Sequence, residues 1–369
     1  MRYLGLIIIL FVVSGCSTSQ EPQPFDPTRP KAHHIQGGFR NLYLDDTQKA
    51  GFFDFLFKVR LQSDWPDENA LAKMPPTPRV SADIASITSP PNKDLQVTWI
   101  GHSTLLIQFD GINILTDPMF SERASPFSFA GPKRYTAPAL SIDQLPDIDA
   151  VIISHNHYDH MDLATIQAIG NTTKWLVPLG NARLLQEVGI TNVIELDWWE
   201  KIDFKGMVLT LTPTQHWSAR GLFDRFATLW GSWAVQFPAR NISFWFGGDT
   251  GYNDIQFKQI GEKLGPFDLS FIPIGAYAPR WFMKGSHVDP EEAVLIHQDI
   301  KSEQSIGIHW GTFVLTSEPV EEPPIALKKA LEKAGLPENS FLALPIGETY
   351  QKPEENTIFA GEEGLFNQN

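Results

Sequence analysis

Residues 150–160 read AVIISHNHYDH, a short β-rich run followed at once by a cluster of histidine and aspartate. Side chains two residues apart on an extended backbone project to the same side, so His155 and His157 can bind one metal ion. After the chain turns, Asp159 and His160 can face a second ion. Four potential ligands within six residues, directly after a strand, predict a dinuclear metal site.

Three more candidate ligands stand at the ends of other β-rich runs. His216, Asp249 and His309 each follow or close such a run, and each alone is compatible with a purely structural side chain. Their recurrence at strand ends favours one shared metal centre. Residues 249–251 (DTG) also match the catalytic tripeptide of aspartic proteases, but those enzymes need two carboxylates and this chain has one copy.

The rest of the chain alternates β-rich and helical patterns from Leu95 onward. Asp110-Gly111 favours a tight hairpin turn, and Asp289-Pro290 is typical of a helix start. The expected strands are residues 97–109, 112–116, 150–154, 175–179, 207–212, 233–237, 242–246, 269–273 and 305–309, and the expected helices lie near 162–169, 181–188, 253–264, 289–300 and 323–334. Hairpins mixed with αβ units favour a layered α/β sandwich.

The order of these ligands resembles the metallo-β-lactamase superfamily, and further segments resemble its branch of N-acylphosphatidylethanolamine-hydrolysing phospholipases D. These segments are residues 98–104 (TWIGHST), 115–118 (LTDP), 131–134 (GPKR), 153–160 (ISHNHYDH), 193–199 (VIELDWW), 215–217 (QHW), 229–233 (LWGSW), 248–252 (GDTGY), 273–277 (PIGAY), 279–283 (PRWFM), 287–293 (HVDPEEA) and 308–313 (IHWGTF). The resemblance implies an α/β fold, the αββα sandwich of the superfamily. Its true β-lactamases usually have another residue at the position of His160, which disfavours antibiotic hydrolysis.

The resemblance also implies two zinc ions. The ligands would be His155, His157 and His216 for one ion, Asp159, His160 and His309 for the other, and Asp249 as the bridge between them. Two adjacent ions lower the pKa of a shared water, so that hydroxide forms at neutral pH, and they bind the oxygens of a phosphodiester. Ligands of this kind suit zinc and also admit iron or manganese.

Three side chains are expected to take part in the chemistry. Asp249 would bridge the ions, and Asp159 would orient the hydroxide. His287 would stabilise charge on the phosphoryl oxygens or protonate the leaving alkoxide, and a structural role at the start of the helix over 289–300 is the alternative. We also expect His102 to orient the carboxylate of Asp117.

Aromatic side chains supply the candidate substrate contacts. Trp217, Trp281, Phe282 and Met283 could line a groove for acyl chains or enter a membrane, and packing in the core is the alternative. The remaining histidines, His33, His34 and His297, belong to no motif.

The N-terminus predicts a lipoprotein. Residues 1–15 have the features of a secretory signal peptide, and residues 13–16 (VSGC) resemble the bacterial lipobox, in which Cys16 would be lipidated. Cys16 is the single cysteine, so no disulfide can form within the chain. We expect a flexible tether over 16–32, an N-terminal extension over 33–92 packed on the main domain, a metallo-β-lactamase domain over 93–350 and a tail over 351–369.

These observations lead to one expected function. The chain would be a zinc-dependent phosphodiesterase of the phospholipase D type, converting N-acylphosphatidylethanolamine or a related phospholipid to phosphatidic acid and an N-acylethanolamine. Its net charge of −14 argues against nucleic acid as a partner. The lipid anchor would hold it on a membrane of the bacterial envelope, and Ser17 favours the outer membrane, facing the periplasm. A homodimer is left open.

Two alternatives stay open. The same metal ligands occur in relatives that hydrolyse lactones or other phosphoesters, so the substrate could differ. A non-catalytic binding lipoprotein of the envelope is the other alternative. It is disfavoured because structural zinc sites are usually closed by cysteine ligands, whereas histidine and aspartate ligation leaves a position open for water.

Overall fold

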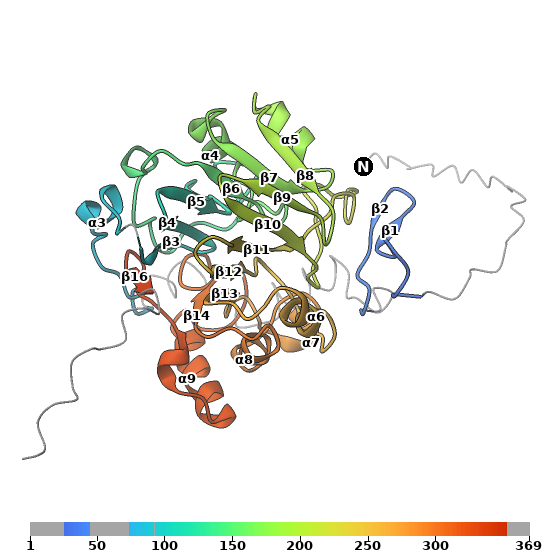
Figure 1. Ribbon diagram of the computed structural model, residues 1–369. Helices are drawn as coiled ribbons and strands as arrows, with labels where there is room; N and C mark the ends of the chain where they lie inside the picture. Colours follow the sequence, from blue (N-terminus) through green and yellow to red (C-terminus); the bar gives the residue numbers. More distant parts are fainter. Residues whose placement is uncertain (1–25, 45–73, 92, 353–369) are drawn as a thin grey trace, which may run out of the picture.

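The computed structural model describes residues 26–44, 74–91 and 93–352. At its centre, two seven-stranded sheets stack face to face, with helices on both outer faces (Figure 1). The first sheet contains, in spatial order, β16 (Thr349–Lys352), β3 (Leu95–Gly101), β4 (Thr104–Phe109), β5 (Ile112–Thr116), β6 (Ala150–Ile152), β7 (Lys174–Pro178) and β8 (Val193–Leu196). The second contains β15 (Phe341–Leu342), β14 (Ser305–Ile308), β13 (Leu269–Pro273), β12 (Ile242–Phe246), β11 (Ser232–Phe237), β10 (Met207–Thr212) and β9 (Lys201–Phe204).

Helices cover both sheets, and a small hairpin precedes them. The helices are α3 (Ile84–Thr88), α4 (Leu163–Ile169), α5 (Ala182–Glu187), α6 (Gln256–Lys263), α7 (Arg280–Met283), α8 (Pro290–Asp299) and α9 (Glu322–Ala334), with short 3-10 turns η3 (Ile142–Gln144) and η4 (Glu338–Ser340). The hairpin pairs β1 (His34–Ile35) with β2 (Gly38–Phe39). In Figure 1, α4 and α5 lie beyond the first sheet, and α6, α8 and α9 lie beyond the second. The predicted αββα sandwich is confirmed.

Alternating side chains build this layered core. Leu105 and Ile107 of β4 point into the core between the two sheets, whereas Leu106 packs on the opposite face with Ile166 of α4 and Leu185 of α5. This period of two follows from the pleat of a strand. Both faces of the central strands are therefore buried, and most of their residues are apolar.

The differences from the expected elements lie mainly at turns and sheet edges. The single run expected over 97–109 is two strands, β3 and β4, joined by a tight turn in which His102 has a φ of 55°. The small β1–β2 hairpin was not expected, and the four strands of the two large sheets that the sequence patterns missed, β8, β9, β15 and β16, are their edge strands. They are short and partly exposed, so they lack the apolar signature of the central strands.

The expected turn and helix signals are confirmed. β4 and β5 form an antiparallel hairpin around Asp110-Gly111. The carboxylate of Asp289 caps α8 by accepting a hydrogen bond of 2.9 Å from the amide of Glu292. Among the described residues, no helix combines the length and the apolar character needed to cross a bilayer. The predicted signal peptide and Cys16 lie outside the described residues, as do parts of the predicted tether, N-terminal extension and C-terminal tail.

Candidate metal centre

The predicted ligands converge from four loops. Residues 155–160 follow β6, His216 follows β10, Asp249 follows β12 and His309 follows β14. Gly248 allows the loop before Asp249 to approach the loop after β6, because a Cβ atom there would lie 2.4 Å from Cβ of Ser154 and its φ is 58°. Stacking of the two sheets thus gathers all seven side chains, which come from positions up to 154 residues apart in the sequence.

Three histidine rings form the first group. Nε2 of His155 lies 2.8 Å from Nδ1 of His157, and Nε2 of His216 lies 3.3 Å from the same Nδ1. Nδ1 of His216 is 2.9 Å from the carbonyl oxygen of Ser286, to which it donates. The Nε2 atom of neutral His216 therefore carries a lone pair directed at the group, as metal ligation requires.

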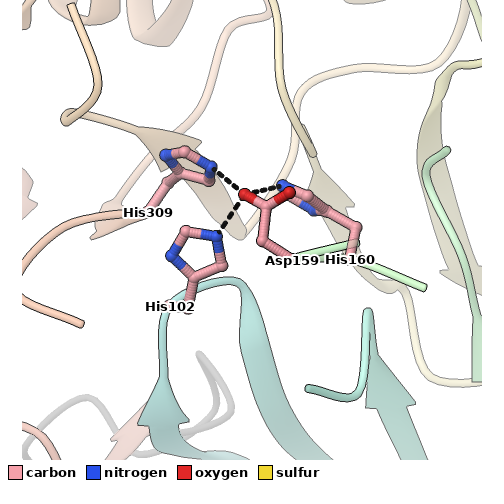
Figure 2. A group of neighbouring side chains, drawn as sticks. All are labelled: His102, Asp159, His160 and His309. Atoms are coloured by element: carbon pink, nitrogen blue, oxygen red, sulfur yellow. Dashed lines mark hydrogen bonds and ion pairs between the residues drawn. The ribbon is translucent and has the colours of Figure 1, made fainter. Parts of the chain in front are cut away.

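An aspartate surrounded by histidines forms the second group (Figure 2). Oδ2 of Asp159 lies 2.9 Å from Nε2 of His102, 3.3 Å from Nε2 of His309 and 3.4 Å from Nε2 of His160. Nδ1 of His160 donates to Oδ2 of Asp117 over 2.7 Å. This bond fixes the His160 ring with Nε2 towards the group.

Asp249 lies between the two groups. Its Oδ2 atom is 3.2 Å from Nε2 of His160, 3.9 Å from Nε2 of His216 and 4.0 Å from Nε2 of His155. Its Oδ1 atom is 3.2 Å from Nε2 of His309. One carboxylate therefore faces histidines of both groups, which is the position expected for a bridging ligand.

The electrostatics favour a cation in the second group. Burial alone would lower the pKa of His309, but the carboxylates of Asp249 and Asp159 raise it to about 9. The same two carboxylates overcome burial and raise the pKa of His160 well above its usual value. In the first group, burial holds the pKa of His155 and of His216 well below 6.5 and lowers that of His157 to about 4. The first group thus presents neutral imidazoles, and the second attracts positive charge.

The donor atoms fit a metal centre. Among the described residues, Nε2 of His160, Nε2 of His309 and Oδ1 of Asp249 are buried without a hydrogen-bond partner. Buried polar atoms are normally paired, so unpaired atoms that converge on one point suggest an ion. Imidazole and carboxylate donors suit zinc, iron or manganese.

His102 and Asp117 each have a different partner from the one expected. The expectation that His102 orients Asp117 is wrong, because its Nε2 atom is bonded to Asp159. Asp117 instead accepts from Nδ1 of His160 and from the backbone amide and hydroxyl of Ser154, at 2.7, 2.7 and 2.5 Å. Both residues support ligands of the second group.

His287 borders the site from the loop before α8. Its Nδ1 atom lies 3.8 Å from Oδ2 of Asp249 and has no hydrogen-bond partner among the described residues. Burial lowers its pKa to about 4, so the ring is neutral at pH 7. The side chain is thus placed to donate one hydrogen bond, and its role in catalysis stays a prediction.

The predicted substrate contacts occupy different environments. The ring of Trp217 packs edge-on against His157, with the ring centroids 4.3 Å apart. On α7, Trp281 is 57% exposed, Phe282 is partly exposed and Met283 is buried. The roles of these four side chains in binding substrate stay predictions.

An N-terminal contribution to the site had no sequence signal. Nε2 of His33 and Nε2 of His34 lie 2.6 and 2.8 Å from the two carboxylate oxygens of Asp197. Nearby in the chain, Nδ2 of Asn41 donates to the carbonyl oxygen of His216 over 2.8 Å. The segment around the β1–β2 hairpin thus contacts the backbone of a candidate metal ligand. The sequence gives no pattern that pairs residues so far apart.

Comparison with known proteins agrees with this geometry. A model of the beta-lactamase superfamily domain matches residues 112–310. The chain is 42% identical over 299 residues to N-acyl-phosphatidylethanolamine-hydrolyzing phospholipase D 1 of Caenorhabditis elegans, covering 77% of this chain and 82% of that protein. It is 29% identical over 261 residues to a UPF0173 metal-dependent hydrolase of Methanopyrus kandleri, covering 70% and 100%. An isothiocyanate hydrolase from Delia radicum gut bacteria shares the fold, with a TM-score of 0.56 and 21% identity over 69% of this chain and 98% of that one.

Proposed function

Because this chain belongs to the metallo-β-lactamase superfamily, in the branch of N-acylphosphatidylethanolamine-hydrolysing phospholipases D, we propose that it is a two-zinc phosphodiesterase of this type. The proposed substrate is N-acylphosphatidylethanolamine or a related phospholipid, and the products are phosphatidic acid and an N-acylethanolamine. The observation that carries the proposal is the position of Asp249 between two groups of imidazoles. A carboxylate in this position could contact two ions at once, and two adjacent ions are what a two-metal hydrolase requires.

The proposed ligands are those that the sequence predicted. His155, His157 and His216 would hold one ion, Asp159, His160 and His309 the other, and Asp249 would contact both. When bound, the two ions would supply hydroxide at neutral pH and neutralise charge on the phosphodiester.

The chain's own residues would orient the reaction. Oδ2 of Asp159 is held by Nε2–H of His102, which fixes the carboxylate in the site. His287 is neutral at pH 7 and would donate a hydrogen bond to a phosphoryl oxygen instead of acting as a cation. Arg280 supports His287 by donating to its carbonyl oxygen over 2.7 Å, and it also pairs with Asp289 at 3.2 Å.

The direct test is turnover of N-acylphosphatidylethanolamine against phosphatidylcholine and a generic phosphodiester, with protein of known metal content. We expect release of N-acylethanolamine that stops with a chelator and returns with zinc. If only the generic phosphodiester is cleaved, the proposed metal site is supported and the proposed lipid substrate is rejected. If no diester is cleaved by protein that contains both metals, the phosphodiesterase assignment fails, and lactones become the next substrates to assay.

Metal binding at pH 7 should release protons to the solvent. His309, with its pKa raised to about 9, and His160, raised well above 6.5, are protonated in the metal-free site. Their positive charge stabilises the metal-free fold fully below pH 6.5, and the contribution of His309 is lost as pH rises through about 9. Zinc must displace both protons, so its affinity should increase with pH across this range.

Titration calorimetry in two buffers of different ionisation enthalpy measures this release. We expect zinc-binding enthalpies at pH 7 that differ between the buffers in proportion to the protons released. Equal enthalpies in both buffers would show that His160 and His309 are already neutral and would contradict the prediction.

A further inference from the structure

Two loops beside the metal centre expose large apolar side chains. Phe127 and Phe129 in the loop over 121–134 are 55% and 79% exposed, and Leu222 and Phe223 in the loop over 217–226 are 82% and 98% exposed. We call these four side chains the apolar rim. Single exposed apolar residues are common, whereas two such pairs on loops that line one cavity mark a candidate contact surface.

The two loops are joined through the metal-binding segment. Tyr158, within residues 155–160, donates its hydroxyl to the carbonyl oxygen of Arg220 over 2.8 Å, and the Arg220 guanidinium lies 4.0 Å above the Tyr158 ring. Phe127, Tyr158 and Arg220 also line one cavity of about 620 Å³. Tyr158 also packs against the apolar cluster of Met119, Ala124 and Phe313, to which the other loop contributes Ala124. The apolar rim is therefore attached to the segment that carries four candidate ligands.

The tip that carries Leu222 and Phe223 is ordered by its own hydrogen bonds. The carboxylate of Asp224 accepts from the amides of Arg220 and Gly221 over 3.0 and 2.8 Å. The amide of Phe226 donates to the carbonyl oxygen of Ser218 over 2.8 Å. These bonds close the base of the turn, and the side chains of Leu222 and Phe223 at its tip are exposed to solvent.

The charge of the loops identifies the kind of partner. Together they contain five basic residues and two acidic ones, in a chain whose net charge is −14. Two of the basic side chains, Arg134 and Arg220, turn inward and donate to backbone carbonyl oxygens. Arg123, Lys133 and Arg225 are at least partly exposed, with Lys133 paired to Glu122 over 2.9 Å, and the carboxylate of Asp224 accepts backbone amides. Exposed aromatic side chains beside basic residues are typical of segments that enter the interface of an anionic bilayer.

We propose that the apolar rim docks on an anionic phospholipid membrane. Phe127, Phe129, Leu222 and Phe223 enter the interface, and the exposed or partly exposed Arg123, Lys133 and Arg225 contact the headgroups. The surface deepens the proposed function, because it would bring the metal centre to the bilayer that contains the substrate. It is separate from the predicted anchor at Cys16, because its four side chains belong to the loops over 121–134 and 217–226.

An environment-sensitive fluorophore placed on the rim tests the docking directly. Cys16 is the only cysteine, so the full chain with Cys16→Ser and Phe223→Cys takes the label at one site. The matched control carries Cys16→Ser and Ile325→Cys, since Ile325 is an apolar side chain on α9 that is 52% exposed. Vesicles of phosphatidylcholine, with and without phosphatidylglycerol, are added without N-acylphosphatidylethanolamine. The readout therefore does not depend on turnover.

The expected result is a blue shift of emission at position 223 that is larger with phosphatidylglycerol, weakens in high salt and is absent at position 325. Replacing Leu222 and Phe129 by serine in the labelled chain should reduce vesicle affinity roughly tenfold or more. The double replacement Leu295→Ser and Ile325→Ser, on α8 and α9, should leave it unchanged. Equal shifts at both labelled positions, or no shift with any vesicle, would overturn the proposal.

Self-association is distinguished in the same experiment. A blue shift at position 223 that grows with protein concentration in the absence of vesicles would show that a second copy of the chain covers the rim, and it would also overturn membrane docking. If the protein docks on vesicles as expected but does not turn over N-acylphosphatidylethanolamine, the proposed function is rejected and membrane docking is retained.

Discussion

Asp249→Asn should remove nearly all hydrolytic activity and lower the metal content of the protein. The carboxylate of Asp249 faces histidines of both groups, and an amide carries no charge to hold two ions. Metal ions contribute several kcal/mol to stabilising charge in a transition state, so we expect kcat to fall by on the order of 10³-fold. Metal analysis after gel filtration, together with turnover of a phosphodiester, measures both effects.

A control variant separates this effect from a general loss of fold. Asp143→Asn changes an exposed aspartate in η3 and should leave metal content and turnover as they are. Circular dichroism of Asp249→Asn should show the secondary structure of the unchanged protein. A variant that keeps two metals and normal turnover would rule out Asp249 as the bridge.

Asp117→Asn should weaken the second metal site although Asp117 is not a proposed ligand. Its carboxylate accepts from Nδ1 of His160 and from Ser154, and the amide of asparagine cannot reproduce all three acceptor contacts. Groups that orient a metal-binding histidine typically change metal affinity or activity by about 10–100-fold when they are replaced. The affinity for the more weakly held metal, followed by competition with a chelator, is the measurement.

The outcome separates a positioning role from a purely structural one. A positioning role predicts loss of one metal with the other retained, and partial recovery of turnover at high zinc concentration. If the melting temperature falls while affinity for both metals stays unchanged, Asp117 only stabilises the fold.

Much of the site was predictable because its ligands belong to local patterns. His155, His157, Asp159 and His160 follow one strand within six residues, and His216, Asp249 and His309 each follow or close another. The edge strands β8, β9, β15 and β16 were missed, because partial exposure leaves such short strands without an apolar pattern.

The sequence by itself determined the order of the central strands and helices along the chain, the cap at Asp289 and the identity of the candidate ligands. These features depend on contacts between near neighbours, which leave a periodic or motif signal. Only the tertiary structure decided that His102 bonds to Asp159, that Asp117 bonds to His160 and that Asn41 supports His216. Such buried polar pairs join residues 43 to 175 positions apart, and stacking of the sheets selects each partner from many side chains of the same type.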